Sequence, residues 1–220
     1  MSTARLVVLA NSWKHHDWCL AGIDLGTGKR VRPVTGLDDG RVPEGSMKLG
    51  GHFPALLDVL EIPLDSTGPD FGFESENRII LPGRWYQRGK MTPKDIERYA
   101  KRTYYVLHNR RKYVTPGELR QKPFDKRATL QLIRVDSFKV RDAQRESTDK
   151  HSWKGLIWSG GREIEVGITD PVFFERLNRG HKPALSCFLT MSLGMPYKPP
   201  DWDADEEPAC WKLISGVIEL

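Results

Sequence analysis

Cys19 is the side chain in this sequence with the clearest capacity for covalent chemistry. A thiol becomes a nucleophile when a neighbouring cation or base favours the thiolate. Two histidines, one lysine and two aspartates lie within five residues of Cys19. This pattern makes Cys19 the leading catalytic candidate, and His15 or Asp24 would move protons in such a reaction.

The same residues also fit two other interpretations. Cys19 begins an apolar run with Leu20 and Ala21, and a single cysteine in such a run is typically a small buried hydrophobe. His15, His16 and Cys19 form only part of a metal site, because a fourth ligand would have to come from a distant segment. No two cysteines have Cys-x-x-Cys spacing, so we expect no structural zinc site. The sequence predicts no metal and no cofactor.

Several polar residues lie where predicted strands meet turns. Asn11–Ser12 and Asp136–Ser137 favour a structural role, because such side chains close turns by bonding nearby backbone amides. Thr169 and Asp170 before Pro171 are typical of a helix N-cap. The polar residues singled out for a structural or functional role are Asn11, Ser12, Glu76, Asn77, Thr169, Asp170 and Lys212.

Residues 98–127 form the most basic segment, with ten Lys or Arg, only two acids and several interleaved tyrosines. Cations suit phosphates and rings suit bases, so the segment permits nucleic-acid binding. A solvated connector whose tyrosines pack on flanking domains explains the same composition. The predicted nucleic-acid contacts are Lys14, Arg30, Arg32, Lys101, Arg102, Tyr105, Arg110, Arg111 and Lys112.

The elements that position these residues are repeated along the chain. The segment 7–14 returns in similar form as 132–139. Three further pairs follow in the same order: hairpins over 20–34 and 155–166, strands over 57–62 and 188–193, and strands over 76–80 and 210–214. Four matches in one order indicate a duplication, although one larger β domain with recurring strand chemistry would also produce them.

Short strands joined by glycine turns favour a mainly β fold with two tandem oligonucleotide-binding (OB) barrels. The predicted domains are 1–90 and 128–220, with a basic helical connector over 91–127. Thr92 before Pro93 predicts a short helix at the start of this connector. Thr115–Glu118 predicts a turn or a second helix that reaches about Gln121.

Composition narrows the function classes. The 220 residues are 39% hydrophobic and contain no apolar span of 18, which excludes a membrane-spanning helix. Three widely spaced cysteines indicate reduced thiols, and a cytoplasmic location is expected. Gly26–Lys29 lacks the spacing of a phosphate-binding loop, and the serine-hydrolase and zinc-deaminase motifs are absent.

Two further features have both a plain and a functional interpretation. The acidic run 201–207 reads as a solvated loop, or as a shield for the basic connector. Seven tryptophans are many for this length. Some of them are expected to offer surfaces on which bases stack.

The motifs taken together resemble the bacterial dual OB-containing domain family. The segments that carry the resemblance are 9–12, 19–24, 27–29, 32–34, 57–63, 75–77, 132–136, 169–171, 189–194 and 210–213. The resemblance implies two tandem OB barrels in a family associated with bacterial and phage systems that modify, recognise or restrict DNA. It implies no particular activity, because the OB fold hosts many tasks.

Three hypotheses follow. The first is a nucleic-acid-binding protein, with DNA as the expected partner, that acts with other proteins of a modification or defence system. The second is an enzyme in which Cys19 attacks a DNA base, for example the nitrile of 7-cyano-7-deazaguanine. The attack gives a thioimidate, which water opens to the amide with release of the thiol. The third is an adaptor that binds another protein.

Overall fold

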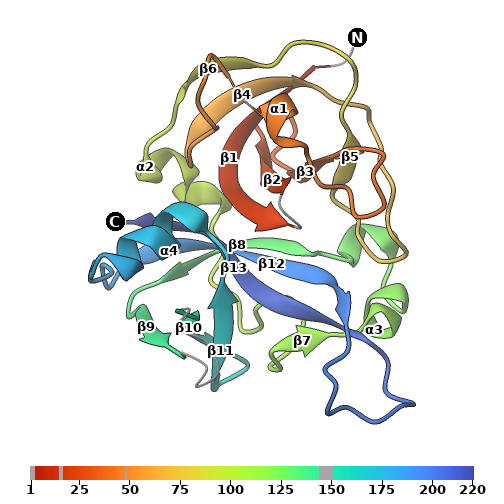
Figure 1. Ribbon diagram of the computed structural model, residues 1–220, viewed down its shortest axis with the longest axis vertical. Coiled ribbons are helices and arrows are strands. Elements are labelled where there is room, and N and C mark those ends of the chain that lie inside the picture. The colour runs from red at the N-terminus through yellow and green to blue at the C-terminus, as the bar shows by residue number, and fades with distance from the viewer. Residues whose placement is uncertain (1–2, 15–16, 48, 144–150) are drawn as a thin grey trace.

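The computed structural model describes residues 3–14, 17–47, 49–143 and 151–220, and its strands form two stacked barrels (Figure 1). The first sheet has the strand order β5-β3-β2-β1-β4-β6. Its strands are β1 (Thr3–Lys14), β2 (Asp17–Asp24), β3 (Arg30–Val34), β4 (Asp58–Pro63), β5 (Asn77–Ile79) and β6 (Tyr86–Lys90). A bridge between Leu64 and Ile80 joins the ends of β4 and β5 and closes the barrel.

The second sheet repeats this topology with different strands. Its order is β8-β12-β13-β11-β10-β9, and β7 adds to β13. Its strands are β7 (Tyr113–Val114), β8 (Leu130–Val135), β9 (Lys139–Asp142), β10 (Trp153–Ser159), β11 (Arg162–Ile168), β12 (Cys187–Tyr197) and β13 (Ala209–Glu219). The parallel pair of β11 with β13 corresponds to that of β3 with β5. The prediction of a mainly β fold with two OB-like barrels is therefore confirmed.

Each barrel has one helix between its third and fourth strand positions. These are α1 (Glu44–Met47) and α4 (Pro171–Asn178). The Asp170 carboxylate accepts hydrogen bonds from the amides of Val172 and Phe173, each at 3.0 Å, so the predicted N-cap is confirmed. No helix in the described part of the chain is long and apolar enough to cross a bilayer.

The connector between the barrels contains four short helical segments. They are α2 (Pro93–Ile96), the 3₁₀ turn η1 (Glu97–Tyr99), α3 (Pro116–Arg120) and the 3₁₀ turn η2 (Phe124–Lys126). The Asp95 carboxylate accepts a hydrogen bond from the Thr92 amide, and Glu118 does the same for Thr115. These reciprocal caps confirm the predicted helix starts. Of the two predictions for Thr115–Glu118, the helix is correct.

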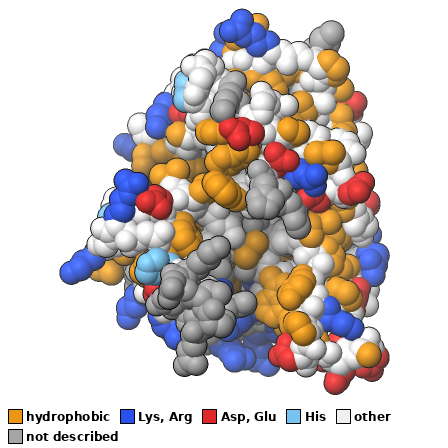
Figure 2. All heavy atoms as spheres, in the orientation of Figure 1, with side chains coloured by type: hydrophobic (Ala, Val, Ile, Leu, Met, Phe, Trp, Pro, Cys, Tyr) orange, Lys and Arg blue, Asp and Glu red, His pale blue; other side chains and the backbone are white. Residues whose placement is uncertain are grey.

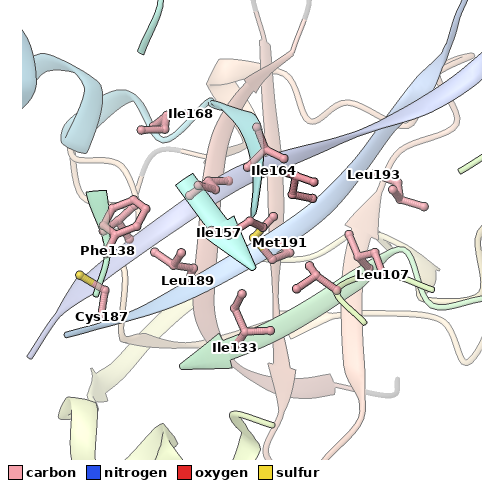
Figure 3. Packing of buried hydrophobic residues seen from close by; sticks show 14 of the residues in the cluster. Leu107, Ile133, Phe138, Ile157, Ile164, Ile168, Cys187, Leu189, Met191 and Leu193 are labelled. Carbon is pink, nitrogen blue, oxygen red and sulfur yellow. The ribbon is translucent and has the colours of Figure 1, made fainter. Parts of the chain in front are cut away.

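Each barrel has its own apolar core. In the second barrel, Ile157 from β10, Ile164 from β11, Met191 from β12 and Ile133 from β8 point toward one another, and Leu107 of the connector covers them (Figure 3). The connector therefore forms part of the core of the second barrel and is not a free linker.

A third apolar cluster joins the two barrels. It contains Val7, Leu9 and Ile23 from the first barrel with Leu132 and Phe188 from the second. The two backbones come close at Gly216, where an added Cβ would lie 2.1 Å from the Leu9 carbonyl oxygen. Thr190 also donates its hydroxyl hydrogen bond to that oxygen, at 2.6 Å. The barrels thus form one packed unit, which fixes the surfaces between them.

Candidate nucleic-acid interface and inter-barrel cavity

A cleft of about 860 Å³ lies where the first barrel, the connector and the second barrel meet, and we name it the connector cleft. The β2–β3 turn, the segment from Arg98 to His108, η2 and β8 form its walls. Four cations and three rings among its lining residues define it: Lys29, Arg30, Arg98, Lys101, Tyr99, Tyr105 and Phe124. Cations for phosphates and rings for bases therefore meet in one concave surface.

The rings of the connector cleft are available to a ligand. Tyr105 is 46% exposed and Phe124 is 52% exposed. The Tyr105 ring rests on Gly160, where a Cβ would lie 2.6 Å from the ring. Gly160 also has a φ of +62°, which favours glycine. The Arg98 guanidinium lies 4.8 Å from the centroid of the Tyr99 ring. The absence of a side chain at Gly160 thus lets the Tyr105 ring pack against the backbone.

The connector cleft has a net positive charge, because four cations line it against the two carboxylates of Glu76 and Asp125. The Glu76 carboxylate accepts hydrogen bonds from the Thr129 amide and hydroxyl, at 2.9 and 3.0 Å, and so ties the two barrels together. Arg30 is 3.8 Å from Glu76 and 37% exposed at its side chain. Burial lowers the pKa of His108, whose Nε2 lies 2.7 Å from the Ala128 carbonyl oxygen, so His108 is neutral at pH 7.

The structure divides the predicted nucleic-acid contacts between several surfaces. Lys101, Tyr105 and Arg30 line the connector cleft. Arg110, Arg111 and Lys112 line a separate cleft of about 460 Å³, which also contains the ring cluster of Tyr113, Trp202 and Trp211. On the face shown in Figure 2, Lys and Arg side chains likewise lie at separate places with Asp and Glu among them.

Arg102, another predicted contact, and Arg120 of the connector both have partners within the protein. Arg102, on the surface, forms an ion pair with Asp136 at 3.0 Å. Arg120 forms one with Glu207 of the acidic loop, also at 3.0 Å, and Glu207 accepts a hydrogen bond from the Gly117 amide. The acidic loop therefore contacts the connector at its second helix.

A cavity of about 420 Å³ lies between the barrels, and we name it the inter-barrel cavity. Its first wall is the outer face of β1 and β2, where Ala10 pairs with Ala21 and Ser12 with Cys19. A bulge between Val8 and Ala10 shifts the register and turns these small residues outward. Its second wall comes from β12 and β13. Because these side chains are small and the second barrel does not fill the space beside them, a cavity remains between the barrels.

Arg32 and Glu74 lie at one side of the inter-barrel cavity. The Arg32 Nη1 is 2.6 Å from the Glu74 carboxylate and 3.3 Å from the Asn77 amide oxygen. Burial alone would lower the pKa of Arg32, but the carboxylates of Glu74 and Glu76 raise it, so the guanidinium stays protonated. Its Nε is buried without a hydrogen-bond partner among the described residues.

The structure separates two of the three proposed catalytic residues, Cys19 and Asp24. The Cys19 thiol, partly exposed, lines the inter-barrel cavity. Asp24 lies five residues further along β2, about 16 Å away at strand spacing, where its carboxylate accepts hydrogen bonds from the Gly26 amide and the Thr27 hydroxyl at 3.0 Å. His15 lies outside the described residues, as does the side chain of Lys14.

The prediction that Asn11 and Ser12 close a turn is wrong. Both residues lie inside β1, paired with Leu20 and Cys19 of β2. The Asn11 amide nitrogen donates to the Pro54 carbonyl oxygen at 2.7 Å, whereas Ser12 lines the inter-barrel cavity. The strand continues past the polar residues because β2 supplies ladder partners as far as Lys14.

The other polar residues have varied surroundings. Thr169 lines the inter-barrel cavity, and its hydroxyl donates to the Ile214 carbonyl oxygen at 3.3 Å. The Asn77 amide nitrogen donates to the Pro69 carbonyl oxygen at 2.7 Å. Lys212 is 2% exposed and donates to the Asn109 carbonyl oxygen at 2.7 Å. Burial lowers the pKa of Lys212 to about 7.

Sequence reasoning missed Glu74, Tyr197, Lys29 and Phe124. Glu74 and Tyr197 belong to the inter-barrel cavity, and the other two belong to the connector cleft. One signal for the inter-barrel cavity was present in the sequence. Small residues alternate along both β1 and β2, which indicates a face that packs against another sheet. Nothing local marks Glu74 as the partner of Arg32.

The architecture defines a class, a protein of two fused OB barrels with concave surfaces at their junction. Comparison with protein families identifies the family: the model of the Dual OB-containing domain (DuOB) matches residues 4–217. The chain therefore belongs to the DuOB family. No curated protein and no solved structure matches it.

Proposed function

We propose that this protein binds single-stranded nucleic acid in the connector cleft. The observation that supports the proposal is the interleaving of four cations with three rings on a surface made by both barrels and the connector. Bases would stack on Tyr105 and Phe124, while Lys101 and Arg30 would neutralise phosphates. A rigid duplex fits less well, because its bases are stacked inside and unavailable to the rings.

DNA as the partner, within a cytoplasmic modification or defence system, is the finer form of this proposal. It rests on the family resemblance. The covalent alternative at Cys19 is less well supported, because no base among the described residues forms a hydrogen bond with its sulfur. That alternative stays a prediction, and a Cys19→Ala protein with full activity on a nitrile-bearing DNA would remove it.

Fluorescence anisotropy with a labelled oligonucleotide of about 16 nucleotides tests the proposal. Tyr105→Ala should weaken binding by about 1–3 kcal/mol, the usual contribution of one stacked base. Lys101→Ala should weaken binding and reduce the slope of log K against log[salt] by about 0.7.

The matched controls are residues outside the connector cleft. Lys182→Ala removes an exposed lysine as Lys101→Ala does, and Trp158→Ala removes an exposed ring of the second barrel. Neither should alter binding. Equal losses in the cleft variants and the controls would reject the connector cleft as the binding surface.

A further inference from the structure

The inter-barrel cavity has the shape and the polar groups of a ligand site of its own. Its volume of about 420 Å³ falls in the range of small-molecule pockets. Its walls combine apolar side chains, such as Leu193 and Leu213, with the hydroxyl groups of Ser12 and Thr169. It shares no lining residue with the connector cleft.

Two exposed aromatic residues line this cavity, one from each barrel. Trp13 of β1 is 62% exposed, and Tyr197 at the end of β12 is 57% exposed. Rings left in solvent beside a concave surface can stack on a planar ligand. The two barrels therefore each contribute a ring to the same opening.

Arg32 gives the cavity a donor with a fixed direction. Its Nη1 is occupied by Glu74 and Asn77, which hold the guanidinium plane in place. The Nε on the other edge is buried and has no partner among the described residues. Since Nε and Nη2 of a guanidinium point in parallel, this edge matches a pair of adjacent acceptors.

The charges of Arg32 and Glu74 favour a neutral ligand over an anion. The Glu74 carboxylate already compensates the Arg32 charge, and both side chains are only 5% exposed. A phosphate placed there would face this carboxylate, whereas a neutral base would not suffer the repulsion. Among planar bases, guanine presents the two adjacent acceptors, O6 and N7, that an arginine edge recognises.

We propose that the inter-barrel cavity binds a guanine-type base, stacked beside Trp13 and Tyr197 and hydrogen-bonded to the free edge of Arg32. The base can come from a free nucleoside or from a nucleotide within a strand, since both present the same edge. The site requires neither turnover nor an occupied connector cleft.

Calorimetric titration of the full chain with guanosine, inosine and adenosine tests the base. Guanosine and inosine share O6 and N7, so both should bind saturably, and adenosine should bind at least about tenfold more weakly because its amino group replaces O6. Equal affinity for adenosine, or no heat with guanosine at millimolar concentration, would overturn the proposal. A guanosine-containing oligonucleotide tests a base that lies within a strand. It is titrated into a Tyr105→Ala protein, so that binding in the connector cleft contributes less to the signal.

Variants at the opening test the site without disturbing the core. Trp13→Ala and Tyr197→Ala should each weaken guanosine binding by about tenfold or more. Trp158→Ala is the matched control, because Trp158 is also 62% exposed but does not line the cavity. Unchanged guanosine affinity in both opening variants would overturn the proposed site. Arg32→Lys keeps the positive charge and loses the planar pair of donors. It should therefore abolish the preference for guanosine over adenosine.

Cys19 supplies a second readout, since it lines the cavity. Cys187 and Cys210 are buried, and burial raises the pKa of each thiol to about 12, so they react slowly. Saturating guanosine should therefore slow the alkylation of Cys19 severalfold. An unchanged alkylation rate in a protein that binds guanosine would place the base elsewhere.

Discussion

The two barrels share one topology, yet the same outer face serves different purposes in each. In the first barrel, the face of β1 and β2 carries Ala10, Ser12, Cys19 and Ala21 and lies against the second barrel. In the second barrel, β10 is the counterpart of β2, and it carries the 62% exposed Trp158. The comparison teaches that the candidate sites depend on how the two copies pack, because each barrel fold alone is the same.

The two barrels also differ in the partners of their buried cations. Arg32 on β3 has a carboxylate partner in Glu74. Lys212 on β13 donates instead to the carbonyl and side-chain oxygens of Asn109, at 2.7 and 3.1 Å. A paired guanidinium remains charged when buried, whereas an amine without a carboxylate loses its proton more readily. The first barrel thus keeps a permanent charge beside its cavity, and the second holds a titratable one.

Removal of the Arg32 partner should have the largest effect on stability. Glu74→Leu leaves a buried guanidinium without its carboxylate, which costs about 3–5 kcal/mol. Urea unfolding of the variant and the parent measures this difference. The double variant Arg32→Met with Glu74→Leu should recover much of the loss, because no charge remains buried. A single variant as stable as the parent would contradict the ion pair's role.

Crowding the junction should have the next largest effect. A Cβ at position 216 would lie 2.1 Å from the Leu9 carbonyl oxygen, so Gly216→Ala forces the barrels apart and costs about 2–3 kcal/mol. Gly36→Ala is the matched control, since a Cβ there meets nothing within 4 Å. Denaturant unfolding should separate the two variants. Equal stability would show that the barrels do not depend on this close approach.

The buried Lys212 should make folding stability depend on pH. Its pKa is about 7 in the folded protein and 10.5 ordinarily, so between these values the unfolded chain binds more protons. Folding stability therefore rises with pH across this window, by up to about 1.4 kcal/mol per pH unit, and the contribution is lost as pH falls toward 7. Lys212→Met should flatten the slope measured by unfolding at pH 7 to 10. An identical slope in both proteins would contradict the lowered pKa.

Local signals in the sequence were sufficient for much of the fold. The caps at Thr92, Thr115 and Asp170 depend on residues within three positions, so spacing alone predicts them. The repeated strand motifs likewise predict two barrels, because alternation and glycine turns specify strands without distant partners.

Only the tertiary structure decided where the functional groups meet. The basic run 98–127 reads as one patch, but folding sends Lys101 to the connector cleft and Arg110 to a different surface. Asn11 looks like a turn residue until β2 pairs with it. Glu74 reaches Arg32 across 42 residues of chain. The sequence determined the strands and the caps because their contacts are local, whereas the cleft and the cavity arise from contacts between distant segments.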